Sequence, residues 1–242
     1  MIVYQSPNFN DRPDGAEVKY LILHYTGMAT GEAALKRLCD NRSKVSSHYF
    51  IEEDGRIYSL VPEEKRAWHA GISAWEGQRD INGHSIGIEL VNPGHDSPGY
   101  KGDYRPFPEA QMKALMTLCK DILARHDIKR WHVLGHSDVA PARKCDPGEL
   151  FDWQRLAEAG IGAWPSEADK KPPSADKRAS FQEKLALYGY VGDVDGDKDS
   201  PMPEITPSVV SAFQRHFRPS NINGVIDEEC RSILDGLLAI KG

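Results

Sequence analysis

The sequence predicts an α/β protein: a mixed central β-sheet flanked by helices, followed by a small three-helix C-terminal domain. Apolar, strand-like runs alternate with helical patterns up to residue 165, whereas only helical spacing follows residue 177. Between them, the segment WPSEADKKPPSADK is rich in proline, serine and charge, which is typical of a linker. We therefore predict a first domain over 1–165, a linker over 166–176 and a helical domain over 177–242.

The first half of the α/β domain begins with a strand and a helix. The apolar run VKYLILH over 18–24 is typical of a buried strand. Residues 30–42 place apolar side chains at helical spacing behind Thr30, which we expect to cap the helix. Asp54 and Gly55 lie between two β-prone runs and predict a hairpin.

The second half of this domain continues the alternation of strands and helices. The segment SIGIELV predicts a strand with Ile86, Ile88 and Leu90 on one face and Gly87 and Glu89 on the other. A helix that begins with Pro at its first position, a short strand and a last helix are expected over 108–126, 131–134 and 151–159.

The C-terminal region shows three helical stripes. Thr206 followed by Pro207 predicts the start of the second of these helices. The stripes consist of Phe181, Leu185 and Tyr188, then Val209, Ala212, Phe213 and Phe217, then Ile233, Leu234, Leu237 and Leu238.

An acidic segment between the first two of these helices has the spacing of an EF-hand calcium loop, with carboxylates at Asp193, Asp195, Asp197, Asp199 and Glu204. Lys198 stands where that loop requires glycine, so we interpret the segment as a solvated acidic turn.

The composition argues against two classes of partner. With 30 basic and 36 acidic residues the formal net charge is −6, and no region is basic enough to predict nucleic-acid binding. Apolar runs are too short for a membrane span, and the N-terminus shows no basic segment followed by an apolar one. We therefore expect a cytoplasmic protein whose 4 cysteines, without a CxxC pair, are reduced thiols.

Polar side chains at the predicted strand ends could bind a metal. His24 ends one strand, His136 follows another, and Asp146 lies in the loop ARKCDPG. Two imidazoles and a carboxylate that leave one position open are typical ligands of catalytic zinc. Glu89 could transfer protons and Lys144 could stabilise an oxyanion. A histidine at a strand end is more often structural, however, and no local zinc motif such as HExxH occurs.

Four motifs taken together favour the metal site. LILHYTG, SSHYFIEEDGRIYSLVPEEKRAWHAG, NGHSIGIELVN and LGHSDVAPARKCDPG resemble, in the same order, the zinc-dependent N-acetylmuramoyl-L-alanine amidases. This superfamily includes T7 lysozyme and the peptidoglycan recognition proteins. The resemblance covers residues 1–165 and is greatest to the branch of recycling and lipoprotein muropeptide amidases.

The resemblance implies a role for each candidate residue. The family's zinc ligands fall on His24, His136 and Asp146, its catalytic glutamate on Glu89 and its catalytic lysine on Lys144. In some branches a cysteine replaces the aspartate ligand. Cys145 is one residue too early for that position, so we interpret it as a bystander.

The resemblance also implies substrate-binding residues. Trp68 and His69 belong to the segment that lines the groove in relatives, and His48 is interpreted as a core or supporting histidine. Lys44, Arg66 and Arg79 are candidates for binding the carboxylates of a stem peptide. The remaining histidines, His84, His95, His126, His132 and His216, match no ligand position and are expected on the surface or in packing.

The C-terminal helices resemble the peptidoglycan-binding domain of cell-wall hydrolases. The leading hypothesis is a zinc amidase that cleaves the bond between N-acetylmuramic or 1,6-anhydro-N-acetylmuramic acid and L-alanine in muropeptides, in cell-wall recycling. The alternatives are a non-catalytic peptidoglycan-recognition module, a phage-type endolysin that acts on the intact sacculus, or a protein exported to the wall. The predicted boundary also implies that a chain ending near Pro165 folds and hydrolyses soluble muropeptides alone.

Overall fold

Six strands form one mixed sheet in the computed structural model, in the order β1-β5-β4-β7-β3-β8. Only the hairpin pair β4–β5 is antiparallel, and the other neighbours run parallel. The strands are β1 (Ile2–Val3), β3 (Tyr20–Tyr25), β4 (Tyr49–Ile51), β5 (Ile57–Ser59), β7 (Ser85–Leu90) and β8 (Val133–Gly135). The predicted mixed sheet is therefore confirmed.

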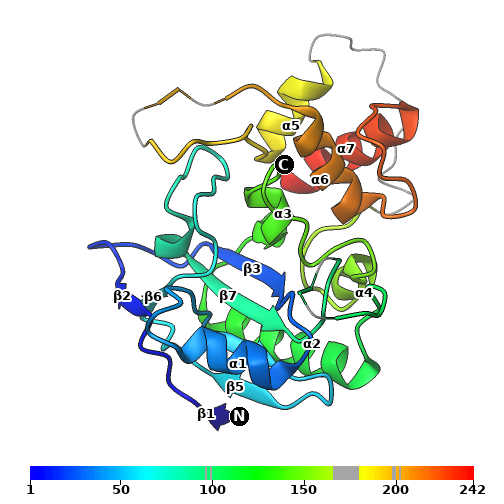
Figure 1. Cartoon of the computed structure of the whole chain (residues 1–242). Helices are drawn as coiled ribbons and strands as arrows, with labels where there is room; N and C mark the ends of the chain where they lie inside the picture. The colour runs from blue at the N-terminus through cyan, green and yellow to red at the C-terminus, as the bar shows by residue number, and fades with distance from the viewer. Residues whose placement is uncertain (96, 99, 166–179, 198–199, 202) are drawn as a thin grey trace. The chain divides into compact units, whose positions relative to one another are not determined.

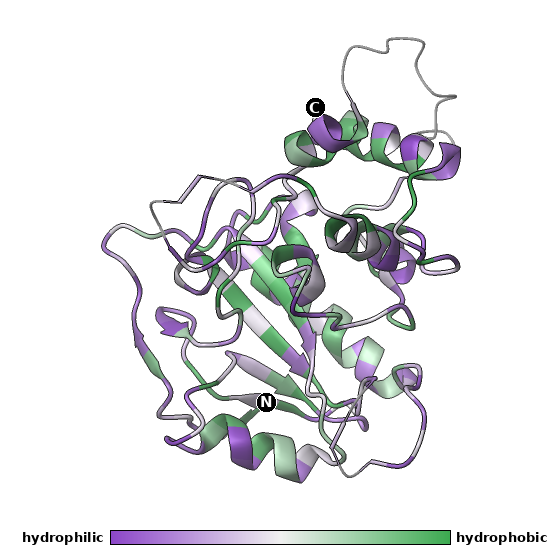
Figure 2. Ribbon diagram, turned by 45° about the horizontal axis from the view of Figure 1, so that its top comes forward, coloured by the Kyte–Doolittle hydropathy of each residue, from purple (hydrophilic) through white to green (hydrophobic). Residues whose placement is uncertain are grey.

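The two longest strands, β3 and β7, lie side by side in the middle of this sheet (Figure 1). Leu21, Ile22 and Leu23 of β3 are fully buried, as are Ile86 and Ile88 of β7. Figure 2 shows both strands mostly in the hydrophobic colours. Strands buried on both faces are typical of parallel sheets, which explains why β3 reads as one continuous apolar run.

Two helices complete the first part of the fold. Helix α1 (Gly31–Cys39) begins where predicted, since the Thr30 hydroxyl accepts a hydrogen bond from the backbone of Ala33. Helix α2 (Glu109–Arg125) starts one residue later than predicted, with Pro108 as its N-cap rather than its first residue. The smaller elements are β2 (Phe9–Asp11), which pairs with β6 (Lys65–Ala67), and the 3-10 helices η1 (Ile81–His84) and η2 (Arg130–His132).

All helices that follow β8 belong to the second part of the fold. A short helix α3 (His136–Val139) follows the strand directly, and α4 (Trp153–Glu158) is capped by the Asp152 side chain. The predicted C-terminal helices are α5 (Phe181–Tyr188), α6 (Pro207–Phe217) and α7 (Glu228–Lys241). Thr206 is the N-cap of α6 and Pro207 its first residue, as predicted.

The structure describes residues 1–95, 97–98, 100–165, 180–197, 200–201 and 203–242. Its contacts divide the chain into one unit of Met1–Gly71 with Ile81–Gly135, and a second unit of Ile72–Asp80 with His136–Gly242. The predicted linker over 166–176 falls among the residues outside this description. The second unit thus combines the predicted helical domain with α3, α4 and the segment Ile72–Asp80 of the predicted first domain.

Candidate metal centre and active site

His24 and Glu89 lie on adjacent strands of the first unit. They are direct partners in the register of β3 and β7, so their side chains leave the sheet on the same face. Gly87 of β7 shares that face, and a Cβ atom there would lie 2.5 Å from Cγ of His69. The glycine of the SIGIEL strand is therefore needed to admit the His69 ring beside Glu89 and His24.

His69 fixes the orientation of the His24 ring. Nε2 of His24 lies 3.0 Å from Nδ1 of His69, and Nε2 of His69 lies 3.0 Å from the Ser85 hydroxyl. All three residues are buried. A metal-binding histidine usually has a hydrogen-bonded partner of this kind on one ring nitrogen, and that partner fixes the orientation of the ring.

His48 has a structural role. Its Nδ1 accepts a hydrogen bond from the backbone N–H of Gly87, so its Nε2 carries the proton and donates to the carbonyl of Lys65. Burial and the nearby Arg12 guanidinium lower the pKa of His48 to about 3. A neutral, fully bonded core histidine agrees with its interpretation from the sequence.

His136 and Asp146 meet in the second unit. Nδ1 of His136 lies 3.1 Å from Oδ2 of Asp146, and the backbone N–H of Ser137 donates to the carbonyl of Asp146. Both side chains are buried. Helix α3 thus carries the histidine and holds the loop that carries the carboxylate.

His24, His136 and Asp146 form a candidate metal-binding group in the described part of the chain. Their ligand atoms lie within 4.8 Å of one another. Ligands of one tetrahedral zinc ion lie about 3–3.5 Å apart, as the His136 and Asp146 atoms do. This group includes Asp146 but not the neighbouring Cys145, which forms no disulfide. Two imidazoles and one carboxylate fit a zinc ion with an open position.

Comparison with known proteins identifies the family. Residues 14–149 match the N-acetylmuramoyl-L-alanine amidase family. The chain belongs to this family. It is 44% identical over 243 residues to the N-acetylmuramoyl-L-alanine amidase AmiD of Escherichia coli (strain K12), covering 93% of this chain and 84% of the relative. It is 34% identical to the 1,6-anhydro-N-acetylmuramyl-L-alanine amidase AmpD of the same organism, over 62% of this chain and 87% of the relative.

Solved structures agree with this assignment. The complex of E. coli AmiD with anhydro-N-acetylmuramic acid-L-Ala-D-γ-Glu-L-Lys matches with a TM-score of 0.77 and 41% identity, over 96% of this chain and 97% of that one. AmpDh3 of Pseudomonas aeruginosa, in complex with an anhydromuramic pentapeptide, matches with a TM-score of 0.78 and 35% identity, over 99% and 98%. The predicted family, fold class and enzyme class are therefore confirmed.

Lys144 of this amidase lies in the loop between α3 and Asp146. Its backbone N–H donates to the carbonyl of Ala140, while its side chain is exposed. An exposed ammonium group can reach a bound substrate. The role of Lys144 as oxyanion stabiliser stays a prediction.

Three of the predicted substrate contacts lie in the first unit of the amidase. The indole N–H of Trp68 donates to the side-chain oxygen of Asn10, and the Arg66 guanidinium donates to the same oxygen. Lys44 is exposed and has a positive φ of 54°. Trp68 and Arg66 thus share one partner on β2, and the substrate contacts of all three residues stay predictions.

Arg79 lies in the second unit, where it fills the acidic turn. Its guanidinium donates to the carbonyls of Asp197 and Ser200, both at 2.7 Å, and lies 3.9 Å from a carboxylate oxygen of Asp195. Arg79 therefore supplies this turn with an internal cation. The turn is bound by a protein side chain rather than only solvated, and a substrate contact of Arg79 stays a prediction.

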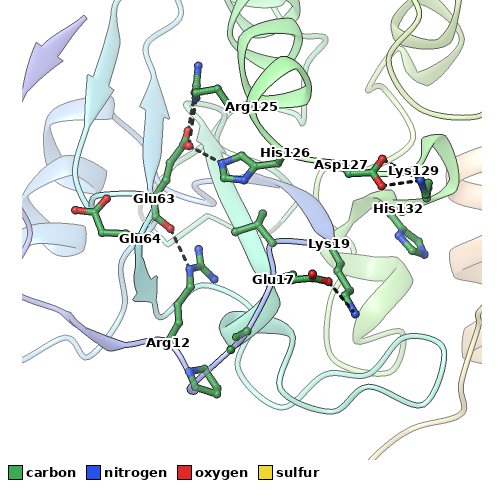
Figure 3. A pocket seen from close by; sticks show the side chains of 14 residues that line it. Arg12, Glu17, Lys19, Glu63, Glu64, Arg125, His126, Asp127, Lys129 and His132 are labelled. Carbon is green, nitrogen blue, oxygen red and sulfur yellow. Dashed lines mark hydrogen bonds and ion pairs between the residues drawn. The ribbon is translucent and has the colours of Figure 1, made fainter.

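A separate hollow in the first unit carries many charges of both signs (Figure 3). Several of its charged groups are paired within the protein: Glu63 accepts hydrogen bonds from Arg125 and His126, and the Arg12 guanidinium donates to the Glu63 carbonyl. Arg12 also donates to the backbone carbonyls of Gly83 and Ser85. These contacts join the segment before β3 to the start of β7 and give the hollow a structural role.

Two roles were not visible in the sequence. His69 was predicted to line the groove, but not to bond His24, because its contact spans 45 positions of the chain. His216 was expected on the surface or in packing; it is buried, and its hydrogen bond to Asp138 was not predicted. No local spacing connects such pairs, and only the fold brings them together.

None of the helices in the described part of the chain combines the length and the hydropathy that a membrane span needs.

Proposed function

We propose that this amidase is a zinc hydrolase that cleaves the amide bond between N-acetylmuramic or 1,6-anhydro-N-acetylmuramic acid and L-alanine in peptidoglycan fragments, in cell-wall recycling. The observation that carries the proposal is the buried group of His24, His136 and Asp146, with Glu89 in register beside His24. The substrates named for the related AmiD and AmpDh3 complexes support the anhydro sugar.

Each candidate residue of the site has one role in the proposed reaction. His24, His136 and Asp146 would hold the zinc ion, which supplies a Lewis acid that polarises a carbonyl and lowers the pKa of water. Glu89 takes a proton from the attacking water and passes it to the leaving nitrogen of L-alanine. Lys144 places a positive charge near the oxygen of the lactyl carbonyl as negative charge develops there. No covalent intermediate with the protein is required.

Two alternatives are separated by substrate and turnover. A recognition module would bind muropeptide without cleaving it, and an endolysin would act best on the intact sacculus. The filled glutamate and ligand positions favour an enzyme over a recognition module. The complexes of the relatives with soluble muropeptides favour the recycling substrate over the sacculus.

The deciding experiment measures zinc content and product release in parallel. We expect the purified chain to hold one zinc ion and to release peptide from soluble anhydromuropeptide faster than from sacculi. Asp146→Ala should lose zinc and turnover together, whereas the matched control Cys145→Ser should keep both. Zinc loss in Cys145→Ser but not in Asp146→Ala would move the third ligand by one residue. A folded, zinc-free wild type without turnover would contradict the proposal.

The predicted cytoplasmic location belongs to this proposal as the site of recycling. Fractionation of cells that express the untagged chain measures it, and recovery in the envelope fraction would favour an exported enzyme.

A further inference from the structure

A buried carboxylate next to the metal ligands receives two hydrogen bonds from the C-terminal helical region. Asp138 of α3 has no exposed surface. The hydroxyl of Tyr190 donates to its Oδ1 at 2.7 Å, and Nδ1 of His216 lies 2.7 Å from its Oδ2. Because a carboxylate accepts hydrogen bonds, Nδ1 of His216 carries the proton.

The two donors are themselves held rigidly. The His216 ring stacks on Trp153 with ring centroids 3.8 Å apart and an interplanar angle of 20°. The Tyr190 ring packs against Trp75 with ring centroids 4.8 Å apart. Burial and the Asp138 charge raise the pKa of Tyr190 far above its ordinary value, so its hydroxyl keeps its proton. Asp138 is therefore bound by two preorganised donors.

Helix α3 needs such external support. It contains only His136–Val139, and a single helical turn is unstable without tertiary contacts. The same short helix carries His136 and holds the Asp146 loop through the N–H of Ser137. A shift or rotation of α3 would therefore move two of the three candidate ligands at once. Both α3 and α6, the helix that carries His216, belong to the second unit and are labelled in Figure 1.

We propose that Asp138, bound by Tyr190 and His216, is a positioning residue for the ligand His136, so that the C-terminal helical region contributes directly to metal affinity. This inference rests on the proposed zinc site. Metal ligands must be held to within about 0.5 Å of their working positions, and loss of supporting contacts typically lowers metal affinity about 10–100-fold. The C-terminal region thereby gains a function inside the catalytic centre, besides any binding of polymer.

The test compares zinc dissociation constants of full-length variants, measured by competition with a chromophoric chelator. Tyr190→Phe removes one oxygen and keeps the packed ring, and we expect its zinc dissociation constant to rise about 10-fold. His216→Ala should raise it by about 10–100-fold. His216→Asn should restore most of the affinity, because the asparagine amide can donate from nearly the position of Nδ1.

Gln214→Ala is the matched control. Gln214 is also buried on α6, but its hydrogen bonds among the described residues go to the segment 223–225 and to Cys230, not to α3. We expect this variant to lower the melting temperature of the zinc-free protein without changing its zinc affinity. Wild-type zinc affinity in folded Tyr190→Phe and His216→Ala would overturn the positioning role alone. Failure of the folded wild type to bind zinc would overturn the proposed metal site and this inference with it.

Discussion

Glu89 owes its place to a single backbone register. Because His24 and Glu89 are direct partners in the register of β3 and β7, the Glu89 side chain leaves the sheet next to that of a candidate ligand. Gly87, two positions earlier on the same face, leaves room for His69. The pairing of Glu89 with His24 and the room that Gly87 leaves for His69 explain why a strand with a glycine and a glutamate belongs in a buried sheet.

Glu89→Gln tests the proton-transfer role. The amide has nearly the shape of the carboxylate but cannot accept the proton of the attacking water. We expect kcat to fall by roughly 10²–10⁴-fold, the usual contribution of a general acid–base group, while zinc content stays unchanged. Metal analysis and peptide release on the same sample check this. Near-normal turnover would remove Glu89 from the mechanism.

Glu63 should control acid stability. Burial raises its pKa, but hydrogen bonds from Arg125, Tyr49 and His126 outweigh burial and lower the pKa from 4.5 to about 2. A carboxyl group whose pKa is lower in the folded than in the unfolded state stabilises the fold when the pH is above its unfolded-state pKa. This contribution is lost as the pH falls through the folded-state pKa. We expect Glu63→Gln to cost on the order of 2 kcal/mol at pH 7, and the difference to vanish between pH 4.5 and about 2.

Urea denaturation of both proteins across this pH range measures the effect, with Glu64→Gln as the exposed neighbouring control. Stability curves of wild type and Glu63→Gln that run parallel from pH 7 to pH 2 would show that the Glu63 carboxylate carries no such linkage.

At the scale of elements, the segment Ile72–Asp80 is held by the C-terminal region. Trp75 packs against Tyr188 and Tyr190, and Lys241 of α7 binds the Glu76 carboxylate at 2.5 Å. Arg79 completes this attachment through the carbonyls of the acidic turn. The segment follows directly on Trp68 and His69, so the C-terminal helices anchor the chain that leaves the predicted substrate groove.

Arg79→Ala separates anchoring from substrate binding. We expect the free energy of unfolding to fall by roughly 1.5–3 kcal/mol, because backbone carbonyls lose charged donors. Amide hydrogen exchange should accelerate at Asp195 and Asp197, while KM for soluble muropeptide stays within about twofold of wild type. A large rise in KM without loss of stability would instead return Arg79 to the groove. Arg66→Ala provides the comparison for a candidate on the β2–β6 surface.

The elements could be predicted where local chemistry decides them. The Thr30 cap, the Asp54–Gly55 turn between β4 and β5, and the Thr206–Pro207 helix start follow from side chains close in sequence. For the candidate ligands, strand ends indicated only a possible metal site, and the resemblance to the amidases assigned His24, His136 and Asp146. The pairs His24–His69 and Asp138–His216 could not be predicted, since each depends on tertiary contacts that leave no periodic pattern in the sequence.

At the scale of the whole chain, the composition of the linker and the contacts of the fold give different divisions. Proline and charge place a boundary at 166–176, whereas the compact second unit begins at His136 and includes Ile72–Asp80. A boundary in composition shows only where the chain is poor in apolar residues. It does not show what a helix packs against, so the segments of α3 and α4 were assigned to the first domain from their order along the chain. Asp138 of α3 and Trp153 of α4 have buried partners at Tyr190 and on α6.

A chain that ends at Pro165 tests this division. From the linker alone it was expected to fold and to hydrolyse soluble muropeptide, but the structure leads to the opposite expectation. Truncation removes Tyr190 and His216, which bind the buried Asp138, and it uncovers Trp75 and Trp153. A buried acceptor that loses its hydrogen bonds costs about 1–3 kcal/mol, a large share of the stability of a domain.

We therefore expect the truncated chain to melt at lower temperature, to bind zinc more weakly and to lose most of its turnover on soluble anhydromuropeptide. Calorimetry, chelator competition and peptide release on the two chains measure these three properties. Binding to insoluble sacculi does not distinguish the two views, because a wall-anchoring role predicts its loss as well. Full zinc affinity and full turnover in the truncated chain would assign the C-terminal helices to polymer binding alone, because His136 would then keep its position without Tyr190 and His216.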